Sequence, residues 1–188
     1  MIRRTFMALM VSVPAALAGP AMAQQFESMS LKPIVKAVRE GDDDKVRQSL
    51  LKGENPNQND TNGQPLLMIA VMAGNTAVVE TLLKGGAIAD SLDREGYTSL
   101  LRAAERGYSY MVEMLLQKNA KADTQNRQGV TALMVASRLG FADVVRALLE
   151  KKANPNKPDF TGRTALTYAK QSGRASIEAM LRKAGGKE

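Results

Sequence analysis

The 188-residue chain contains no histidine and no cysteine. Their absence excludes Ser-His-Asp and Cys-His nucleophilic sites, HExxH zinc sites and clusters of Cys and His around a metal. Aromatic residues make up only 4% of the chain, too few for the stacking surfaces that bind single-stranded nucleic acids. The sequence therefore predicts no enzyme activity, no cofactor, no metal site and no nucleic-acid partner.

The sequence also lacks a hydrophobic run of about 20 residues, the length that spans a bilayer. Residues 1–23 instead resemble a secretory signal peptide, with cleavage expected after Ala23 and a short linker over residues 24–29. Without cysteine no lipid can be attached to the new N-terminus, so we expect no membrane anchor. The predicted location is the periplasm, or alternatively the extracellular space. The signal consists of basic Arg3 and Arg4, an apolar stretch from Phe6 to Ala18 and the site Ala21-Met22-Ala23.

Arg3-Arg4 resembles part of a twin-arginine signal, although the general secretory route fits the segment better.

Residues at four positions, two of them glycine, one leucine and one alanine, recur every 33 residues without an insertion. Each unit opens with Asp or Asn three residues before a glycine, which is typical of a type I turn. A threonine suited to capping a short helix usually follows, and a second glycine ends that helix. Paired apolar residues then predict a second helix, which Asn75, Ser109, Asp143 and Ser176 should cap. The recurring positions are Gly63, Gly96, Gly129 and Gly162; Leu67, Leu100, Leu133 and Leu166; Ala37, Ala70, Ala103, Ala136 and Ala169; and Gly41, Gly74, Gly107, Gly140 and Gly173.

This pattern resembles the ankyrin-repeat family, whose signature Thr-Pro-Leu-His-x-Ala is recognisable at residues 98–103, 131–136 and 164–169. The resemblance implies an all-α ankyrin-repeat solenoid of helix-turn-helix units linked by β-turn or hairpin loops. The family's histidine, which usually links neighbouring units, is replaced by Val35, Met68, Leu101, Met134 and Thr167, so apolar packing should take over that link. Five units are expected, at residues 28–60, 61–93, 94–126, 127–159 and 160–188.

The first and last units carry polar residues where the inner units are apolar, as terminal repeats do. Lys45 and Ser49 stand at the positions of Val78 and Leu82, which we assign to the face toward the preceding unit. Glu178 and Arg182 stand at the positions of Val79 and Leu83, assigned to the face toward the following unit. Residues 28–60 and 160–188 are therefore the expected N-terminal and C-terminal capping repeats.

One loop position is expected to reduce the stability of the fold, because its residue type does not suit a left-handed backbone. Lys152 stands where the other units have Gly53, Gly86 and Asn119, residue types that tolerate a left-handed backbone.

The family resemblance also implies that a partner protein binds to the turn tips and to the concave face formed by the first helices. Residues at these positions differ between units, whereas the frame residues do not. Arg and Tyr, which are enriched at binding hot spots, are among them. The predicted binding residues are Met72, Arg94, Tyr97, Glu105, Arg106, Arg127, Arg138, Leu139, Phe160 and Arg163.

Net charge rises along the five units, from 0 and −2 to +1, +3 and +4. This favours a partner with an acidic surface, with anionic lipid headgroups as the alternative. The resulting hypothesis is a monomeric periplasmic protein-interaction module, either an accessory subunit of another exported protein or one that neutralises a toxin. A secreted effector that binds a host protein is the alternative.

Overall fold

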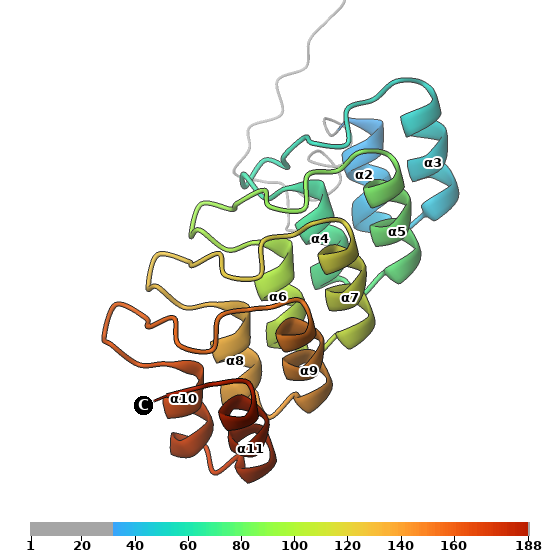
Figure 1. Ribbon diagram of the computed structural model, residues 1–188. Helices are drawn as coiled ribbons and strands as arrows, with labels where there is room; N and C mark the ends of the chain where they lie inside the picture. The colour runs from blue at the N-terminus through green and yellow to red at the C-terminus, as the bar shows by residue number, and fades with distance from the viewer. Residues whose placement is uncertain (1–31, 188) are drawn as a thin grey trace, which may run out of the picture. The chain divides into compact units, whose positions relative to one another are not determined.

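The computed structural model describes residues 32–187 and contains there ten helices, which follow one another as five helix-turn-helix pairs (Figure 1). The predicted signal peptide, its cleavage site after Ala23 and the linker over residues 24–29 lie outside the described residues. The helices are α2 (Pro33–Glu40), α3 (Asp43–Leu51), α4 (Leu66–Met72), α5 (Thr76–Lys84), α6 (Ser99–Arg106), α7 (Ser109–Gln117), α8 (Ala132–Leu139), α9 (Ala142–Glu150), α10 (Ala165–Gln171) and α11 (Ala175–Lys183).

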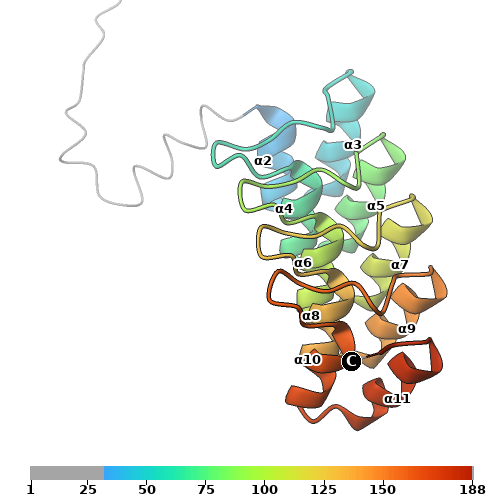
Figure 2. The ribbon, with the colours of Figure 1, turned by 60° about the vertical axis from the view of Figure 1, so that its left-hand side comes forward.

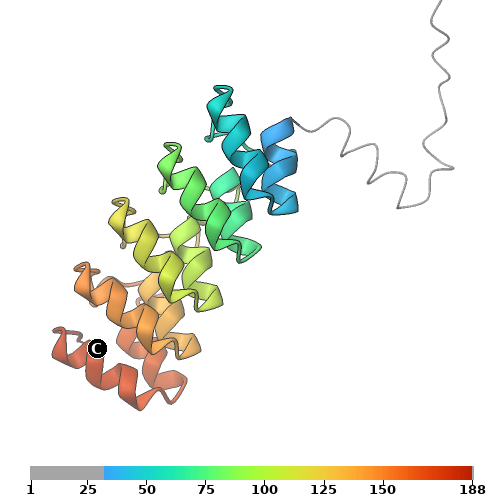
Figure 3. The same ribbon diagram turned by 90° about the vertical axis from the view of Figure 1, so that its right-hand side faces the viewer.

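The five pairs stack in chain order. The first helix of each pair packs against the first helix of the next, and the second helices do the same, so that two parallel layers result (Figures 1 and 3). Long loops connect each second helix to the next pair and end in a turn tip beside the first-helix layer (Figure 2). In the part of the chain that the structure describes, antiparallel bridging is limited to Asn59 with Pro65 and Leu92 with Thr98. The all-α repeat architecture is confirmed.

The ends of the first helices agree with the sequence pattern. The hydroxyl of Thr98 accepts a hydrogen bond from the N–H of Leu101 at 3.1 Å, and Thr131 and Thr164 cap α8 and α10 in the same way. Gly107 ends α6 with a φ of 70°, a left-handed conformation that favours glycine.

The second helices begin differently from the prediction. Asn75 does cap α5, accepting from the N–H of Val78 at 3.1 Å. Ser109 is already the first residue of α7, and Asp143 and Ser176 are the second residues of α9 and α11, so none of these three is the capping residue.

Larger residues hold the capping positions instead because they pack between neighbouring pairs. Tyr108, Phe141 and Arg174 each lie over the glycine that ends the first helix of the preceding pair. A Cβ added at Gly107 would be only 2.7 Å from the ring of Phe141. Contact between repeats therefore determines the residue type at this position, rather than the need to bind a free N–H group.

The second-helix positions assigned to the following unit contact that unit. Leu50 lies against Gly85 of the next pair, and Leu149 lines a surface groove with Met180 and Ala184 of the last pair. In the last pair the equivalents of these inner apolar residues are Glu178, which is half-buried, and Arg182, which is exposed. Both polar residues are therefore at least partly open to solvent, and the assignment of residues 160–188 as a capping repeat stays a prediction.

The first pair agrees with the cap prediction at one position only. Lys45 is exposed as expected, but Ser49 is buried, with 6% of its surface accessible.

Neighbouring units are joined at their loops by side chains that sequence reasoning did not identify. Asn57, Asp90, Asp123 and Asn156 are spaced 33 residues apart, and each accepts a hydrogen bond from the N–H 31 residues further along the chain, at 2.7 to 2.9 Å. Val35, Met68, Leu101 and Met134 are buried where the expected histidine would stand. Apolar packing therefore replaces the histidine in these four units, and the loop amides and carboxylates add a polar link.

The loop position of Lys152, where we expected a local loss of stability, has a left-handed backbone in every unit. Lys152 and Asn119 both have a φ of 61°, whereas Gly53, Gly86 and Gly185 have values of 85 to 89°. A lysine in this conformation is strained because its Cβ approaches the backbone carbonyl.

Candidate interaction surface

Each turn tip is built around one buried Asp or Asn side chain: Asp60, Asp93, Asn126 or Asp159. In all four turns the Oδ1 atom accepts hydrogen bonds from the backbone N–H groups two and four residues further on, at 2.8 to 3.0 Å. One side-chain oxygen thereby fixes the backbone of the whole tip.

The second carboxylate oxygen in the three aspartate turns is bound by another side chain. Arg39 of the preceding pair donates to Asp60 at 2.8 Å, and Arg102 of the same pair donates to Asp93 at 3.2 Å.

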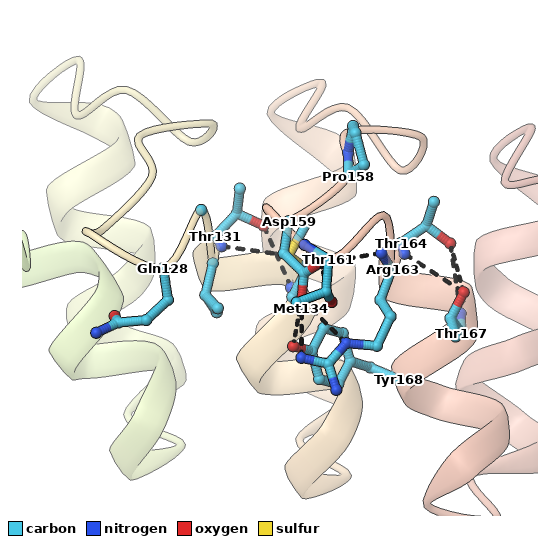
Figure 4. A network of polar contacts seen from close by, with 12 residues as sticks. Gln128, Thr131, Met134, Pro158, Asp159, Thr161, Arg163, Thr164, Thr167 and Tyr168 are labelled. Carbon is cyan, nitrogen blue, oxygen red and sulfur yellow. Dashed lines mark hydrogen bonds and ion pairs between the residues drawn. The ribbon is translucent and has the colours of Figure 1, made fainter.

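Asp159 has the most complete set of partners, since the Tyr168 hydroxyl donates at 2.7 Å and the Arg163 Nε at 3.1 Å (Figure 4). Burial acts to raise the pKa of Asp159, but hydrogen bonds from Thr161, Tyr168 and the tip backbone outweigh it and hold the pKa well below its usual range.

The turn at Asn126 differs from the other three. Its side chain lines a hollow of about 170 Å³ together with Tyr97, Glu105 and Arg138 from the first-helix layer and tips, and with Gln128, Val130, Met134, Val135 and Tyr168. We call this the Asn126 hollow. The structure thus brings together three predicted binding residues, Tyr97, Glu105 and Arg138, that lie up to 41 positions apart in the sequence.

Two of these walls are held in place by Arg102. Its guanidinium lies 3.6 Å from the centre of the Tyr97 ring and donates to Glu105 at 3.1 Å. Arg102 is also the partner of Asp93, so one largely buried cation fixes a tip, an aromatic ring and a carboxylate.

The tip residues Arg94, Arg127 and Phe160 have a structural contact that the sequence did not predict. Each lies over the glycine of the preceding tip, namely Gly63, Gly96 and Gly129. The tips are also joined by backbone hydrogen bonds, from Arg127 N–H to the Glu95 carbonyl at 3.4 Å and from Phe160 N–H to the Gln128 carbonyl at 3.3 Å. The tips consequently form a continuous ridge, on which Phe160 remains 73% exposed.

The remaining predicted residues lie along the same face. Arg94 lines a second hollow of about 210 Å³ with Asn62, Gln64 and Arg102. Met72 is near the Gln64 amide, at 3.9 Å from sulfur to nitrogen. Arg106 and Leu139 are exposed at the ends of α6 and α8 but do not line either hollow, and Arg163 is bound to Asp159. We use the term tip face for the ten predicted binding residues together with Asn126.

Sequence reasoning missed Arg102 and Tyr168, the residues that complete two of the turns. Their position holds Lys36, Ile69 and Val135 in the other three pairs, so no periodic signal marks it. The available signal was an Asp nine residues before an Arg or a Tyr, at Asp93 with Arg102 and at Asp159 with Tyr168.

Two kinds of feature are absent from residues 32–187. None of the helices in residues 32–187 is both long and apolar enough to cross a membrane. The same residues contain no group of three or more Asp or Glu side chains placed to hold a metal ion.

Comparison with known proteins gave one result. A family model described as ankyrin repeats (3 copies) matches residues 34–126 and again residues 118–187. No curated protein is similar enough to the chain to count as a match.

Proposed function

The chain belongs to the ankyrin-repeat family, and on this premise we propose that it is a non-catalytic, exported module that binds another protein through its tip face. Ankyrin repeats are in general protein-interaction modules. The proposal for this chain concerns the surface that binds, the charge of the partner and the location in the cell.

The observation that carries the proposal is the contrast between a periodic frame and an aperiodic tip face. The position of Ala103 is alanine in all five units, the position of Leu100 is leucine in four units and Ile34 in the first, and all of these residues are buried. Positions such as Arg106, Arg138 and Leu139 instead vary between units and are exposed. Packing does not determine these exposed residues, and Arg138 lines one of the two hollows on the same face, each of a size that a side chain can enter. Such a surface suits recognition of a protein, where a few Arg and aromatic anchors supply most of the affinity.

The charge of the tip face favours an acidic partner. Among its members Arg94, Arg106, Arg127 and Arg138 make no ion pair with another residue in 32–187, while the single acidic member, Glu105, is paired with Arg102. Complementary charge raises association rates and disfavours basic partners. An accessory subunit or a toxin-neutralising protein would both use the surface in this way.

The proposed location is the periplasm, because residues 1–23 have the composition of a signal peptide. Cell fractionation followed by mass spectrometry of the mature N-terminus tests this. We expect a chain beginning at Gln24 in the periplasmic fraction, and recovery from the culture medium would favour the secreted-effector alternative.

Affinity capture from the envelope fraction tests the binding surface. The double variant Arg106→Glu and Arg138→Glu reverses two unpaired charges of the tip face and should reduce recovery of the partner by about tenfold or more. The matched control reverses Lys118 and Arg146, which are exposed on the second-helix side. Equal recovery with the tip-face variant and the control would reject the proposal.

A further inference from the structure

We propose that the Asn126 hollow is a binding site for a carboxylate, in the form of a glutamate or aspartate side chain of the partner protein. This inference rests on the proposed function and specifies one chemical group that the tip face recognises. The hollow lies between the tips that begin at Asp93 and Asn126, beside α6 and α8.

The orientation of the Asn126 side chain is fixed by the turn. Its Oδ1 accepts from the N–H groups of Gln128 and Val130, each at 3.0 Å, so the amide nitrogen must point the other way. Asn126 is 5% exposed, and its amide nitrogen donates no hydrogen bond to any residue in 32–187. The nitrogen is not one of the side-chain atoms that are closed off from solvent without a partner, and because Asn126 lines the hollow, its N–H2 group can meet a ligand there. The hollow is thus supplied with two unused hydrogen-bond donors.

Comparison with the other tips explains why this nitrogen lacks a partner. Asp60 is bound by Arg39, but the equivalent of Arg39 for this turn is Glu105, which already accepts from Arg102. Asp93 and Asp159 are bound by Arg102 and Tyr168, but their equivalent here is the apolar Val135. In each of the other three tips a side chain of this protein binds the second carboxylate oxygen. At the Asn126 tip neither of the two equivalent positions holds such a partner, and a neutral amide replaces the carboxylate.

Arg138 gives the hollow its charge preference. It is exposed, it lines the hollow, and its guanidinium makes no hydrogen bond or ion pair with any residue between Lys32 and Lys187. Glu105, which also lines the hollow, is bound by Arg102, and Arg102 pairs with Asp93 and Glu95 as well. The unpaired groups at the site are therefore an amide N–H2 and a guanidinium, both donors, and the group that satisfies both is a carboxylate.

The walls suit the aliphatic part of an acidic side chain. Tyr97, Val130 and Met134 supply apolar surface, and the Tyr97 ring is held in position by Arg102. A glutamate could place its methylene groups against these residues while its carboxylate reaches the donors of Asn126 and Arg138. A lysine or arginine of a partner would instead leave both donors unbound and approach Arg138 unfavourably.

An NMR titration of the ¹⁵N-labelled protein tests the site. The probe is N-acetyl-glutamate methylamide, and its glutamine counterpart is the uncharged control. We expect saturable shifts of the Asn126 side-chain amide, the Val130 N–H and the Arg138 Nε–H with the glutamate probe, at millimolar affinity, and none with glutamine. Equal shifts with both probes, or unchanged resonances at these three groups, would overturn the inference.

Three variants sharpen the result. Asn126→Asp retains the acceptor that organises the turn, as in the other three tips, but replaces the amide donor by a carboxylate oxygen and adds one negative charge, so the Val130 shift should disappear. Asn62→Asp makes the same chemical change on an exposed tip and should leave probe binding unchanged. Arg138→Gln, at an exposed position, should weaken binding several-fold. Retention of the Val130 shift in Asn126→Asp, with a folded circular dichroism spectrum, would exclude the site.

The captured partner separates failure of this inference from failure of the proposed function. If recovery falls with the charge reversals at Arg106 and Arg138 but is unchanged with Asn126→Asp, the protein-binding function stands and the carboxylate site is wrong. If the probe binds at Asn126 but no tip-face variant affects recovery, the site stands as a carboxylate site and the proposed function is wrong.

Discussion

The fourth and fifth helix pairs, α8–α9 and α10–α11, share the helix-turn-helix arrangement, and three of the equivalent positions at which they differ can be compared directly. The turn before α8 begins with Asn126, and the turn before α10 with Asp159. Val145 of α9 is fully buried, whereas its equivalent in α11, Glu178, is half-buried. The left-handed loop position holds Lys152 after α9 and Gly185 after α11. At each of these positions the surroundings differ between the two pairs, so a different residue type is suitable. Each residue can be substituted to test this.

The largest effect is expected from a charge placed inside the stack. Val145→Glu should destabilise the protein by about 4 kcal/mol, because it places a carboxylate in a fully buried apolar position. Glu178→Val should change stability by less than about 1 kcal/mol. Urea denaturation followed by circular dichroism measures both, and similar losses would contradict the assignment of this helix face to contact with the following pair.

The next largest effect concerns the two turns. Asp159→Ala removes an acceptor that binds Tyr168, Arg163 and Thr161, so it should cost about 3 kcal/mol. Asn126→Ala removes only the two backbone hydrogen bonds of its tip and should cost about 1 to 2 kcal/mol. Thermal unfolding of the two variants measures which substitution costs more stability. A larger loss for Asn126→Ala would contradict the statement that the Asn126 side chain has fewer partners than Asp159.

Acid should distinguish the same two turns. The folded-state pKa of Asp159 is depressed, so its stabilising contribution is complete above the unfolded pKa of about 3.9 and is lost as pH falls toward the folded value. The difference in unfolding free energy between wild type and Asp159→Asn should therefore narrow, by about 2 kcal/mol, as pH is lowered from neutral to about 2. A difference that stays constant over this range would show that the Asp159 charge does not stabilise the tip.

The smallest effect is expected at the loop position. Lys152→Gly should raise the unfolding free energy by about 0.5 to 1 kcal/mol, since relief of the left-handed strain exceeds the entropy that glycine adds to the unfolded chain. Gly185→Lys should have the opposite sign, and no atom outside its neighbours lies within 4 Å to compensate it. A lower melting temperature for Lys152→Gly would contradict this account.

The frame of the molecule was predictable from the sequence because it repeats. A turn glycine, a leucine and an alanine that return every 33 residues define the helix pairs without any knowledge of distant contacts. Asn75 was predicted correctly as a second-helix cap, but the other three caps were predicted wrongly. Tyr108, Phe141 and Arg174 hold those positions because they contact the preceding pair, which a rule about local N–H groups does not include.

The unpartnered amide nitrogen of the turn at Asn126 could not be predicted for a related reason. Asp and Asn are equivalent as turn residues, so Asn126 looked like the other three. The difference depends on where the second side-chain atom points and on which pair supplies its partner: Arg39 from the preceding pair for one tip, Arg102 and Tyr168 from the same pair for two others. A repeat pattern gives the position of each residue but not this choice of partner.

Site-specific photocrosslinking in the cells that produce the protein tests the central claim, binding through the tip face, most directly. A photoreactive phenylalanine is placed at Leu139, which is exposed on the tip face, or at Glu113, which is exposed on α7 in the second-helix layer. We predict a covalent adduct with one partner protein from position 139 and none from position 113. An adduct from position 113 with none from position 139 would contradict the account.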